Sequence, residues 1–223
     1  VGPVSFEAVR TTAEAPVVAR FLAATDQYHC GAAVIELSAH ALSLNRVDGI
    51  VFDVAAFTNL QHDHLDYYGD METYFAAKAL LFTPEHSRRG VVCVDDEWGR
   101  RLADRATIPV TTVSALTHEA ADWQVRDVTP DKSIGRTVFT LVSPDGSPHR
   151  VAMPILGEVN VQNTAVAIVS AVSLGLSLED AISSVEDAPQ IPGRMEKVNP
   201  TPGTQPLVIV DYAHTPEALE WTL

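Results

Sequence analysis

The chain has 223 residues, of which 46% are hydrophobic, and 29 acidic against 15 basic residues give it a formal net charge of −14. This composition is typical of a folded globular protein, and the length allows one sizeable core or one domain plus part of another. The negative charge argues against nucleic acid or an anionic membrane as a partner, and no apolar run is long enough to cross a bilayer. Cys30 and Cys93 lack metal-binding spacing, so we expect no disulfide framework and a cytoplasmic location.

The first forty residues contain two polar runs next to apolar patterns. The run Arg10-Thr11-Thr12-Ala13-Glu14 precedes Pro16, and residues 16–22 have helical periodicity, which predicts a capped helix start. Residues 32–37 form an apolar run that predicts a short buried strand, and Glu36-Leu37-Ser38-Ala39-His40 lies at its end. A glutamate near the end of a buried strand either finds a structural partner or binds a cation, and both remain open for Glu36.

A second apolar run, residues 50–57, also predicts a buried strand. A polar cluster follows it directly and consists of Asn59, His62, Asp63, His64 and Asp66. Because ligands of open α/β sheets bind at the carboxyl ends of the strands, this cluster is a candidate site. The alternative is a polar surface loop without a ligand.

The stretch after this cluster predicts a helix with one unusual lysine. Met71, Phe75, Lys78 and Phe82 are spaced so that they share one helical face, and Lys78 is one of only three lysines in the chain. Burial pushes a lysine towards the neutral amine, which is a nucleophile and can capture carbon dioxide as an anionic carbamate. Alternatively, Lys78 reaches solvent along its aliphatic stem.

The second half of the chain predicts more of an α/β sheet. Residues 91–94 and 108–113 predict buried strands, and Asp95-Asp96-Glu97 between them predicts a helix N-terminus that the helix dipole favours. Short alternating runs within residues 122–154, with a turn at Pro144-Asp145-Gly146, predict an antiparallel meander at the edge of a parallel sheet.

The C-terminal part predicts two helices, a linker and a last strand. Asn160 is the expected N-cap of a helix with Gly175 just after its end, and Ser177 begins the next helix. Residues 189–204 are rich in Pro and Gly and predict a linker. Residues 207–210 predict a strand, after which Thr215 and Pro216 suit the start of a helix.

Several of these motifs, in this order, resemble those of the Mur ligases, the ATP-dependent ligases that form amide bonds in peptidoglycan synthesis. The similarity is greatest to the branch that adds the third residue to UDP-N-acetylmuramoyl-L-alanyl-D-glutamate. The matching motifs are Thr-Thr-Ala-Glu at 11–14, Glu-Leu-Ser-Ala-His at 36–40, DHLDYYG with METYFAAKALLF at 63–82, Gly-x-x-Asn-x-x-Asn at 157–163, Ile-Pro-Gly-Arg-Met-Glu at 191–196 and Asp-Tyr-Ala-His-Thr-Pro at 211–216. Ala13 and Ala39 depart from the family, which has proline and serine there.

The resemblance implies a role for ten residues. Magnesium would be held by Glu36, His64 and carbamoylated Lys78, and His64 and Lys78 would form the catalytic centre. The UDP-sugar-peptide substrate would be bound by Thr11, Thr12, Ser38 and Arg46. The adenosine part of ATP would be bound by Asn163, Arg194 and Asp211.

The resemblance also implies the fold and the domains. Residues 1–190 would form the central ATPase domain, an α/β domain of the P-loop type with a mostly parallel sheet flanked by helices. Residues 191–223 would be the hinge and the first strand and helix of a second, Rossmann-like domain. No Gly-Lys pair occurs, so the phosphate-binding loop is absent. Because the chain begins with Val1 and lacks this loop with its strand, we expect a segment of a longer protein that is inactive alone, less stable, or self-associating.

The implied reaction joins UDP-MurNAc-L-Ala-D-Glu to a diamino acid, either diaminopimelate or lysine. The D-glutamate carboxylate attacks the γ-phosphate of ATP, and the amine of the diamino acid attacks the resulting acyl phosphate. Two alternatives remain. One is another Mur-type ligase related to folylpolyglutamate or cyanophycin synthetases, and the other is a binding module without catalysis, which the missing phosphate loop favours.

Overall fold

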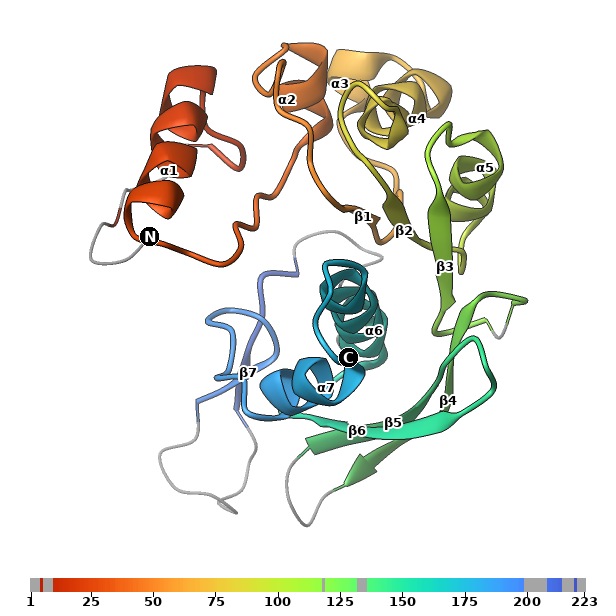
Figure 1. Ribbon diagram of the computed structural model, residues 1–223. Coiled ribbons are helices and arrows are strands. Elements are labelled where there is room, and N and C mark those ends of the chain that lie inside the picture. Colours follow the sequence, from red (N-terminus) through yellow and green to blue (C-terminus); the bar gives the residue numbers. More distant parts are fainter. Residues whose placement is uncertain are drawn as a thin grey trace. The chain divides into compact units, whose positions relative to one another are not determined.

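The computed structural model describes residues 5, 10–117, 119–131, 136–198, 208–213 and 219 (Figure 1). Its contacts divide the chain into two compact units. Unit 1 contains Val1–Ala55, Leu60–Arg89 and Ala106–Pro109, and unit 2 contains Ala56–Asn59, Gly90–Arg105 and Val110–Leu223. None of the described helices is both long and apolar enough to span a membrane. The predicted domain boundary at residue 190 stays a prediction.

Unit 1 is built mainly from helices. They are α1 (Ala15–Gln27), α2 (Ala39–Ser43), α3 (Leu65–Tyr68), α4 (Met71–Ala79) and the 3-10 helix η1 (Leu80–Phe82). The predicted helix start before Pro16 is confirmed, although the capping residue Glu14 makes no side-chain cap bond. The N-cap of α4 is Asp70, whose carboxylate accepts a hydrogen bond from the Thr73 amide at 2.7 Å.

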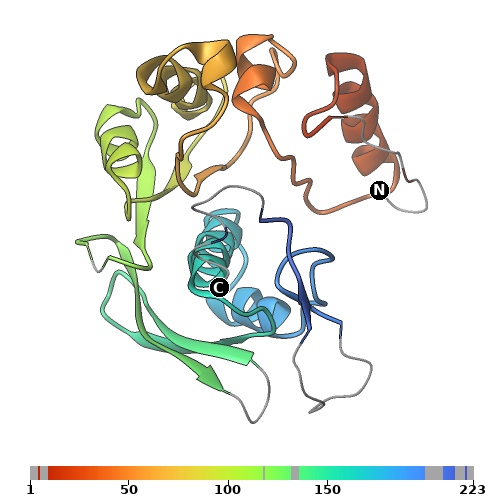
Figure 2. The same cartoon turned by 180° about the vertical axis from the view of Figure 1, so that it is seen from behind.

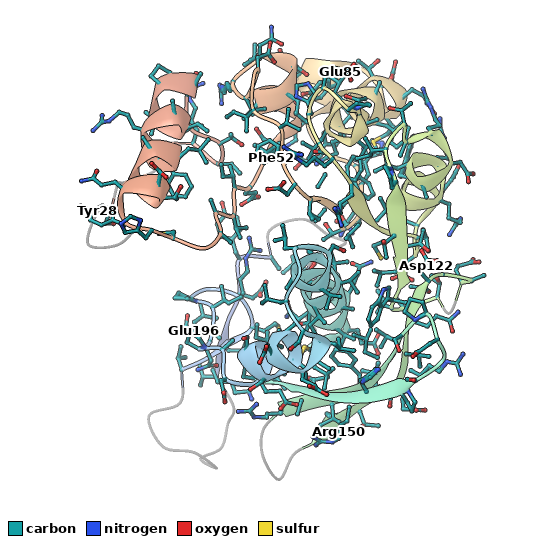
Figure 3. All side chains as sticks on the ribbon, viewed as in Figure 1. Tyr28, Phe52, Glu85, Asp122, Arg150 and Glu196 are labelled. Carbon is teal, nitrogen blue, oxygen red and sulfur yellow. The ribbon has the colours of Figure 1, made fainter. Side chains whose placement is uncertain are left out.

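The strand predicted at residues 50–57 is shorter than expected. Strand β1 covers only Ala55–Phe57, and upstream of it Phe52, labelled in Figure 3, forms a single parallel bridge with Ser87. The buried strand predicted at residues 32–37 is wrong. This segment has no strand partner among the described residues, and Val34 is 89% exposed. An apolar run becomes a strand only where a neighbouring backbone pairs with it, and composition does not reveal that neighbour.

The sheet has the order β1-β2-β3-β4-β5-β6. Its strands in unit 2 are β2 (Gly90–Cys93), β3 (Val110–Ser114), β4 (Trp123–Asp131), β5 (Arg136–Val142) and β6 (Pro148–Met153). Neighbours β2, β3 and β4 pair in parallel, whereas β4, β5 and β6 pair antiparallel. The predicted antiparallel meander at the edge of a parallel sheet is therefore confirmed, and so is the turn, where Gly146 has a φ of 84°.

Helices cover this sheet and complete the core of unit 2. Helix α5 (Glu97–Arg105) connects β2 to β3, and helices α6 (Glu158–Ser173) and α7 (Leu178–Glu186) pack on the sheet, as Figures 1 and 2 both show. Val161, Ala165 and Ile168 of α6 are buried, as are Phe139 and Leu141 of β5. Full burial of each large apolar side chain contributes about 1.5–3 kcal/mol, so this interface is a main source of stability.

The observed ends of α6 and α7 agree in part with those predicted from the sequence. The N-cap of α6 is Gly157 and not Asn160, whose amide instead donates to the Leu156 carbonyl at 2.6 Å. The expectation for Asn160 is wrong because a glycine with a φ of 96° starts the helix three residues earlier. Gly175 follows the end of α6 with a φ of 102°, and Ser177 caps α7 through the Asp180 amide, both as predicted.

The last described strands are β7 (Glu196–Lys197) and β8 (Ile209–Val210), which pair antiparallel. A strand was predicted at residues 207–210, and β8 confirms its second half. The helix start predicted at Thr215 and Pro216 lies outside the described residues, as does most of the predicted second domain.

Candidate functional site

In unit 1, His64 lies at the start of α3 in a left-handed backbone conformation, with a φ of 55°. Such a conformation is uncommon for residues other than glycine and is concentrated at functional sites. The Asp63 carboxylate stabilises it, since Oδ1 accepts a hydrogen bond from the His64 amide at 2.7 Å. Nearly half of the His64 side chain is exposed, so the imidazole is accessible to a ligand.

An aromatic cluster surrounds this histidine. The His64 ring makes edge-on contacts with His40 at 5.1 Å and with Tyr74 at 5.7 Å, and Tyr74 stacks on Tyr68 at 5.1 Å. Burial raises the pKa of Tyr74 to about 12, with the charge of Asp63 as a further cause. Burial also lowers the pKa of His40, and the neighbouring His64 adds to this effect. The cluster forms one wall of the candidate site, beside the partly exposed imidazole of His64.

Lys78 on α4 lies against the same cluster. Its Nζ is 5.3 Å from the centre of the Tyr74 ring. Burial lowers the pKa of Lys78, while the charges of Glu36 and Asp63 oppose this shift without cancelling it. Phe75 and Phe82 of the same stripe are buried, as expected, and the lowered pKa of Lys78 has the direction expected for a lysine on a buried helix face. The carbamate itself stays a prediction.

Glu36 lies in the extended segment before α2, and its side chain is exposed. The negative charge of Glu36 raises the pKa of Lys78 and so partly opposes the effect of burial. Within the described parts of the chain, no three His, Cys, Asp or Glu side chains form a ready metal cage. A lysine carbamate would add two oxygens that share one negative charge, and oxygen is the ligand that Mg²⁺ prefers. The donor chemistry fits magnesium once Lys78 is carbamoylated.

Three of the four predicted substrate-binding residues are joined by hydrogen bonds. Thr12 Oγ1 lies 2.9 Å from the Ser38 amide, which donates to it, and the Arg46 guanidinium donates to the Thr12 carbonyl at 3.0 Å. Ser38 also starts α2, since its hydroxyl accepts from the Ala41 amide at 3.2 Å. Thr11 is exposed beside them. Thr12, Ser38 and Arg46 form one hydrogen-bonded network, and we call these three residues together with Thr11 the threonine loop.

In unit 2, the pairing of β7 with β8 brings Arg194 and Asp211 together. The Asp211 carboxylate accepts hydrogen bonds from the amides of Met195 and Ala213, both at 2.8 Å. The Arg194 guanidinium lies 5.5 Å from the centre of the Tyr212 ring. Glu196 of β7, labelled in Figure 3, closes the turn by accepting from the Gly193 amide at 2.8 Å. Arg194 is exposed.

The third predicted nucleotide contact, Asn163, projects from α6 and is exposed. The N-terminus of α6 lies against the β7 turn, because a Cβ added at Gly157 would be 3.9 Å from the Met195 side chain. No described contact joins Asn163 to Arg194 or Asp211. Next to Asn163, Gln162 is buried and donates to Asp95 at 3.2 Å, which fixes the rotation of the helix.

A family model, the Mur ligase middle domain, matches residues 1–171. The chain belongs to the Mur ligase family. The UDP-N-acetylmuramyl-tripeptide synthetase of Leifsonia xyli is 45% identical over the whole chain, and the UDP-N-acetylmuramoyl-L-alanyl-D-glutamate–2,6-diaminopimelate ligase of Streptomyces coelicolor is 43% identical. The chain spans 43% of the length of either relative.

Solved structures agree with this assignment. The structure of a UDP-N-acetylmuramoyl-L-alanyl-D-glutamate–2,6-diaminopimelate ligase superposes with a TM-score of 0.69 at 33% identity, over 82% of this chain and 37% of the other. The Mur ligase fold expected from the sequence motifs is thereby confirmed.

In this Mur ligase chain, sequence reasoning missed two residues of the candidate site, His40 and Tyr74, and it named Asp63 in the polar cluster without its effect on Lys78. His40 and Tyr74 form its aromatic wall, and Asp63 both holds His64 and acts on Lys78. Tyr74 could have been found, because it precedes Lys78 by four residues and therefore shares its helix face. His40 and Asp63 lie in the quoted motifs, but only the folded chain brings His40 to His64 and the charge of Asp63 to Lys78.

Proposed function

We propose that this chain is part of an ATP-dependent ligase that forms an amide bond between the D-glutamate of UDP-MurNAc-L-Ala-D-Glu and a diamino acid, diaminopimelate or lysine. The names of the relatives support this substrate, since one is a UDP-N-acetylmuramyl-tripeptide synthetase and another a 2,6-diaminopimelate ligase. They favour it over the folylpolyglutamate-type and non-catalytic alternatives. A cytoplasmic enzyme of peptidoglycan synthesis is the corresponding biological role.

One observation carries the proposal: Lys78 is held beside Glu36, Asp63 and the His64–Tyr74 cluster with a lowered pKa. The neutral Lys78 amine attacks the carbon of carbon dioxide, a C–N bond forms while one C=O π pair moves onto oxygen, and the attacking nitrogen then loses one proton to solvent, which leaves a carbamate anion. Glu36, His64 and this carbamate would then hold magnesium. Bound Mg²⁺ supplies charge neutralisation for the phosphates and for the developing acyl phosphate.

The remaining candidate residues bind and orient the two substrates, the muramyl peptide and ATP. The threonine loop, with Thr11, Thr12, Ser38 and Arg46, holds the muramyl peptide so that its carboxylate is positioned for attack. In unit 2, Asn163, Arg194 and Asp211 hold the adenosine part of ATP. Asp211 is already fixed by two backbone amides, so it costs little further ordering on binding.

The carbamate can be tested directly in this chain. ¹³C-labelled bicarbonate should give a carbamate carbon signal in the NMR spectrum that Lys78→Arg abolishes. Lys197→Arg is the matched control, because Lys197 also has a lowered pKa through burial but lies in β7, away from the candidate residues of unit 1. An unchanged signal in Lys78→Arg would contradict the proposed role of Lys78.

Nucleotide binding provides a second test. Because the chain has no Gly-Lys phosphate loop, we expect only weak ATP binding by these 223 residues. Calorimetric titration with ATP and Mg²⁺ measures it, and Asn163→Ala should weaken it further. Tight magnesium-dependent binding would show that the chain holds the phosphates by other means.

A further inference from the structure

Thr12 is the most deeply buried polar residue of the threonine loop, with only 1% of its surface exposed. Its hydroxyl donates to the Glu36 carbonyl at 2.8 Å and accepts from the Ser38 amide at 2.9 Å. A threonine hydroxyl has a single proton to donate. That proton is already used inside the protein, so Thr12 has no donor to offer to a ligand.

Arg46 is similarly enclosed, with 7% of its surface exposed. Its Nη1 donates to the Thr12 carbonyl at 3.0 Å, and its Nε lies 3.3 Å from the Glu14 carboxylate. The guanidinium therefore hydrogen-bonds to Thr12 and forms an ion pair with Glu14. Glu14 also pairs with Arg10 at 3.1 Å, which extends the network to the loop's exposed side.

Glu36 is the residue on which this network converges. Its backbone carbonyl is tied to Thr12, and two residues later Ser38 is tied to Thr12 and caps α2. The main chain of Glu36 is thus held between the threonine loop and a helix N-terminus. Its carboxylate is exposed. A shift of Thr12 would move this carboxylate, even though the side chains of Thr12 and Glu36 make no bond with each other.

We propose that Thr12 and Arg46 are positioning residues, which set the Glu36 carboxylate through the main chain and couple it to the loop that presents Thr11. This inference rests on the proposed function and refines it, because the Thr12 hydroxyl then acts inside the loop and the exposed Thr11 hydroxyl is the one of the two that is available to the substrate. A change in this hydrogen-bonded segment should therefore alter both the affinity for the muramyl peptide and the affinity for the metal.

The experiment compares two threonines that are neighbours in sequence but differ in burial. Thr12→Val removes the buried hydroxyl at nearly constant volume, Thr12→Ser keeps the hydroxyl, and Thr11→Val makes the same change on the exposed residue. Two affinities are measured in the protein at its full natural length, in bicarbonate buffer. Mn²⁺, as a stand-in for Mg²⁺, is titrated by electron paramagnetic resonance, and UDP-MurNAc-L-Ala-D-Glu is titrated by calorimetry.

We expect Thr12→Val to weaken Mn²⁺ binding by about 10–100-fold, the usual effect of losing a group that orients a metal ligand. It should weaken peptide binding as well. Thr12→Ser should restore both affinities, and Thr11→Val should weaken only peptide binding. If Thr12→Val does not fold, as judged by circular dichroism, Arg46→Gln tests the other end of the network and should weaken Mn²⁺ binding similarly.

The outcomes separate the inference from the proposed function. If Thr12→Val, or Arg46→Gln in its place, binds Mn²⁺ as the wild type does, the positioning role is refuted while the metal site stands. The same conclusion follows if Thr11→Val weakens Mn²⁺ binding as much as Thr12→Val does. If the wild-type protein binds no Mn²⁺, the proposed metal site is itself refuted, and the inference with it.

Discussion

Asp95 allows the sharpest prediction about stability, because its carboxylate holds together the end of the parallel sheet in unit 2. Oδ1 accepts from the amides of Ala115 and Thr117 and from the hydroxyls of Ser114 and Thr117, at 3.0–3.2 Å. Oδ2 accepts from the Leu116 amide, Gln162 Nε2 and Cys93 Sγ, also at 3.1–3.2 Å. Only an acceptor with two oxygens can meet so many donors.

The Asp95→Asn substitution keeps the shape and replaces one oxygen with an NH₂ group. If the NH₂ takes the place of Oδ2, it faces the Leu116 amide, and if it takes the place of Oδ1, it faces the Thr117 amide. In either orientation a donor meets a donor. An unsatisfied buried donor costs about 1–3 kcal/mol, and bonds to a charged acceptor are stronger than neutral ones. We expect a loss of about 2–4 kcal/mol, or about 5–15 °C in Tm.

The stability difference between the wild type and Asp95→Asn should also depend on pH. Burial alone would raise the pKa of Asp95, but the hydrogen bonds from Cys93 and from the amides of Leu116, Ala115 and Thr117 outweigh it, and the pKa is lowered from its usual value of 3.8. A lowered pKa contributes stability above the unfolded pKa, and this contribution is lost as the pH falls through the folded pKa. The difference between wild type and Asp95→Asn should therefore be full at neutral pH and shrink below about pH 4.

Urea unfolding followed by circular dichroism measures both effects, between about pH 7 and pH 3. Asp145→Asn is the matched control, since Asp145 also accepts from Ser143 and Ser147 but lies in the exposed hairpin turn, and it should have a much smaller effect. A wild-type-like stability of Asp95→Asn at neutral pH, or a difference that does not decrease in acid, would refute the reasoning.

Three further predictions concern stability and the candidate site. Gly99→Ala should destabilise by about 3 kcal/mol or more in a thermal melt, because the new Cβ would lie 1.8 Å from the Cys93 carbonyl oxygen and two backbones would have to separate. Ser177→Ala should cost about 1 kcal/mol by losing the cap of α7, and Ser177→Thr should largely restore it. Tyr74→Leu should reduce the ¹³C-carbamate signal of Lys78 by admitting water beside its Nζ, whereas Tyr74→Phe should retain the signal.

The elements that sequence reasoning predicted well are those fixed by local patterns. The alternation in residues 122–154 and the Pro-Asp-Gly turn sufficed to predict the meander, because each strand pairs with its neighbour in sequence. The cap at Ser177 and the glycine after α6 are likewise read from single residues. The lysine in the apolar face of α4 was recognised for the same reason, since helical periodicity alone places Lys78 beside Phe75.

The features that sequence reasoning missed depend on partners far away in the chain. Residues 32–37 have a strand-like composition, yet pairing decides whether a strand forms. The acidic run at residues 95–97 was predicted as a helix start, which holds for Asp96, whose carboxylate accepts from the Gly99 amide at 2.6 Å. Asp95 instead binds the loop after β3, about twenty residues further on. Nothing in the run distinguishes these two roles.

Thr11 and Thr12 show why a sequence motif can locate a site without revealing which of its residues binds the ligand. The sequence alone does not distinguish the two threonine side chains, and either hydroxyl could face a ligand. Folding turns Thr12 inward, where Glu36 and Ser38 use its hydroxyl completely, and leaves Thr11 outside. A buried hydroxyl with both its donor and acceptor satisfied stabilises geometry, whereas an exposed one can exchange water for a substrate at little cost. Burial therefore decides which residue of a shared motif binds and which one positions, and the Mn²⁺ titration of the two valine variants measures that difference.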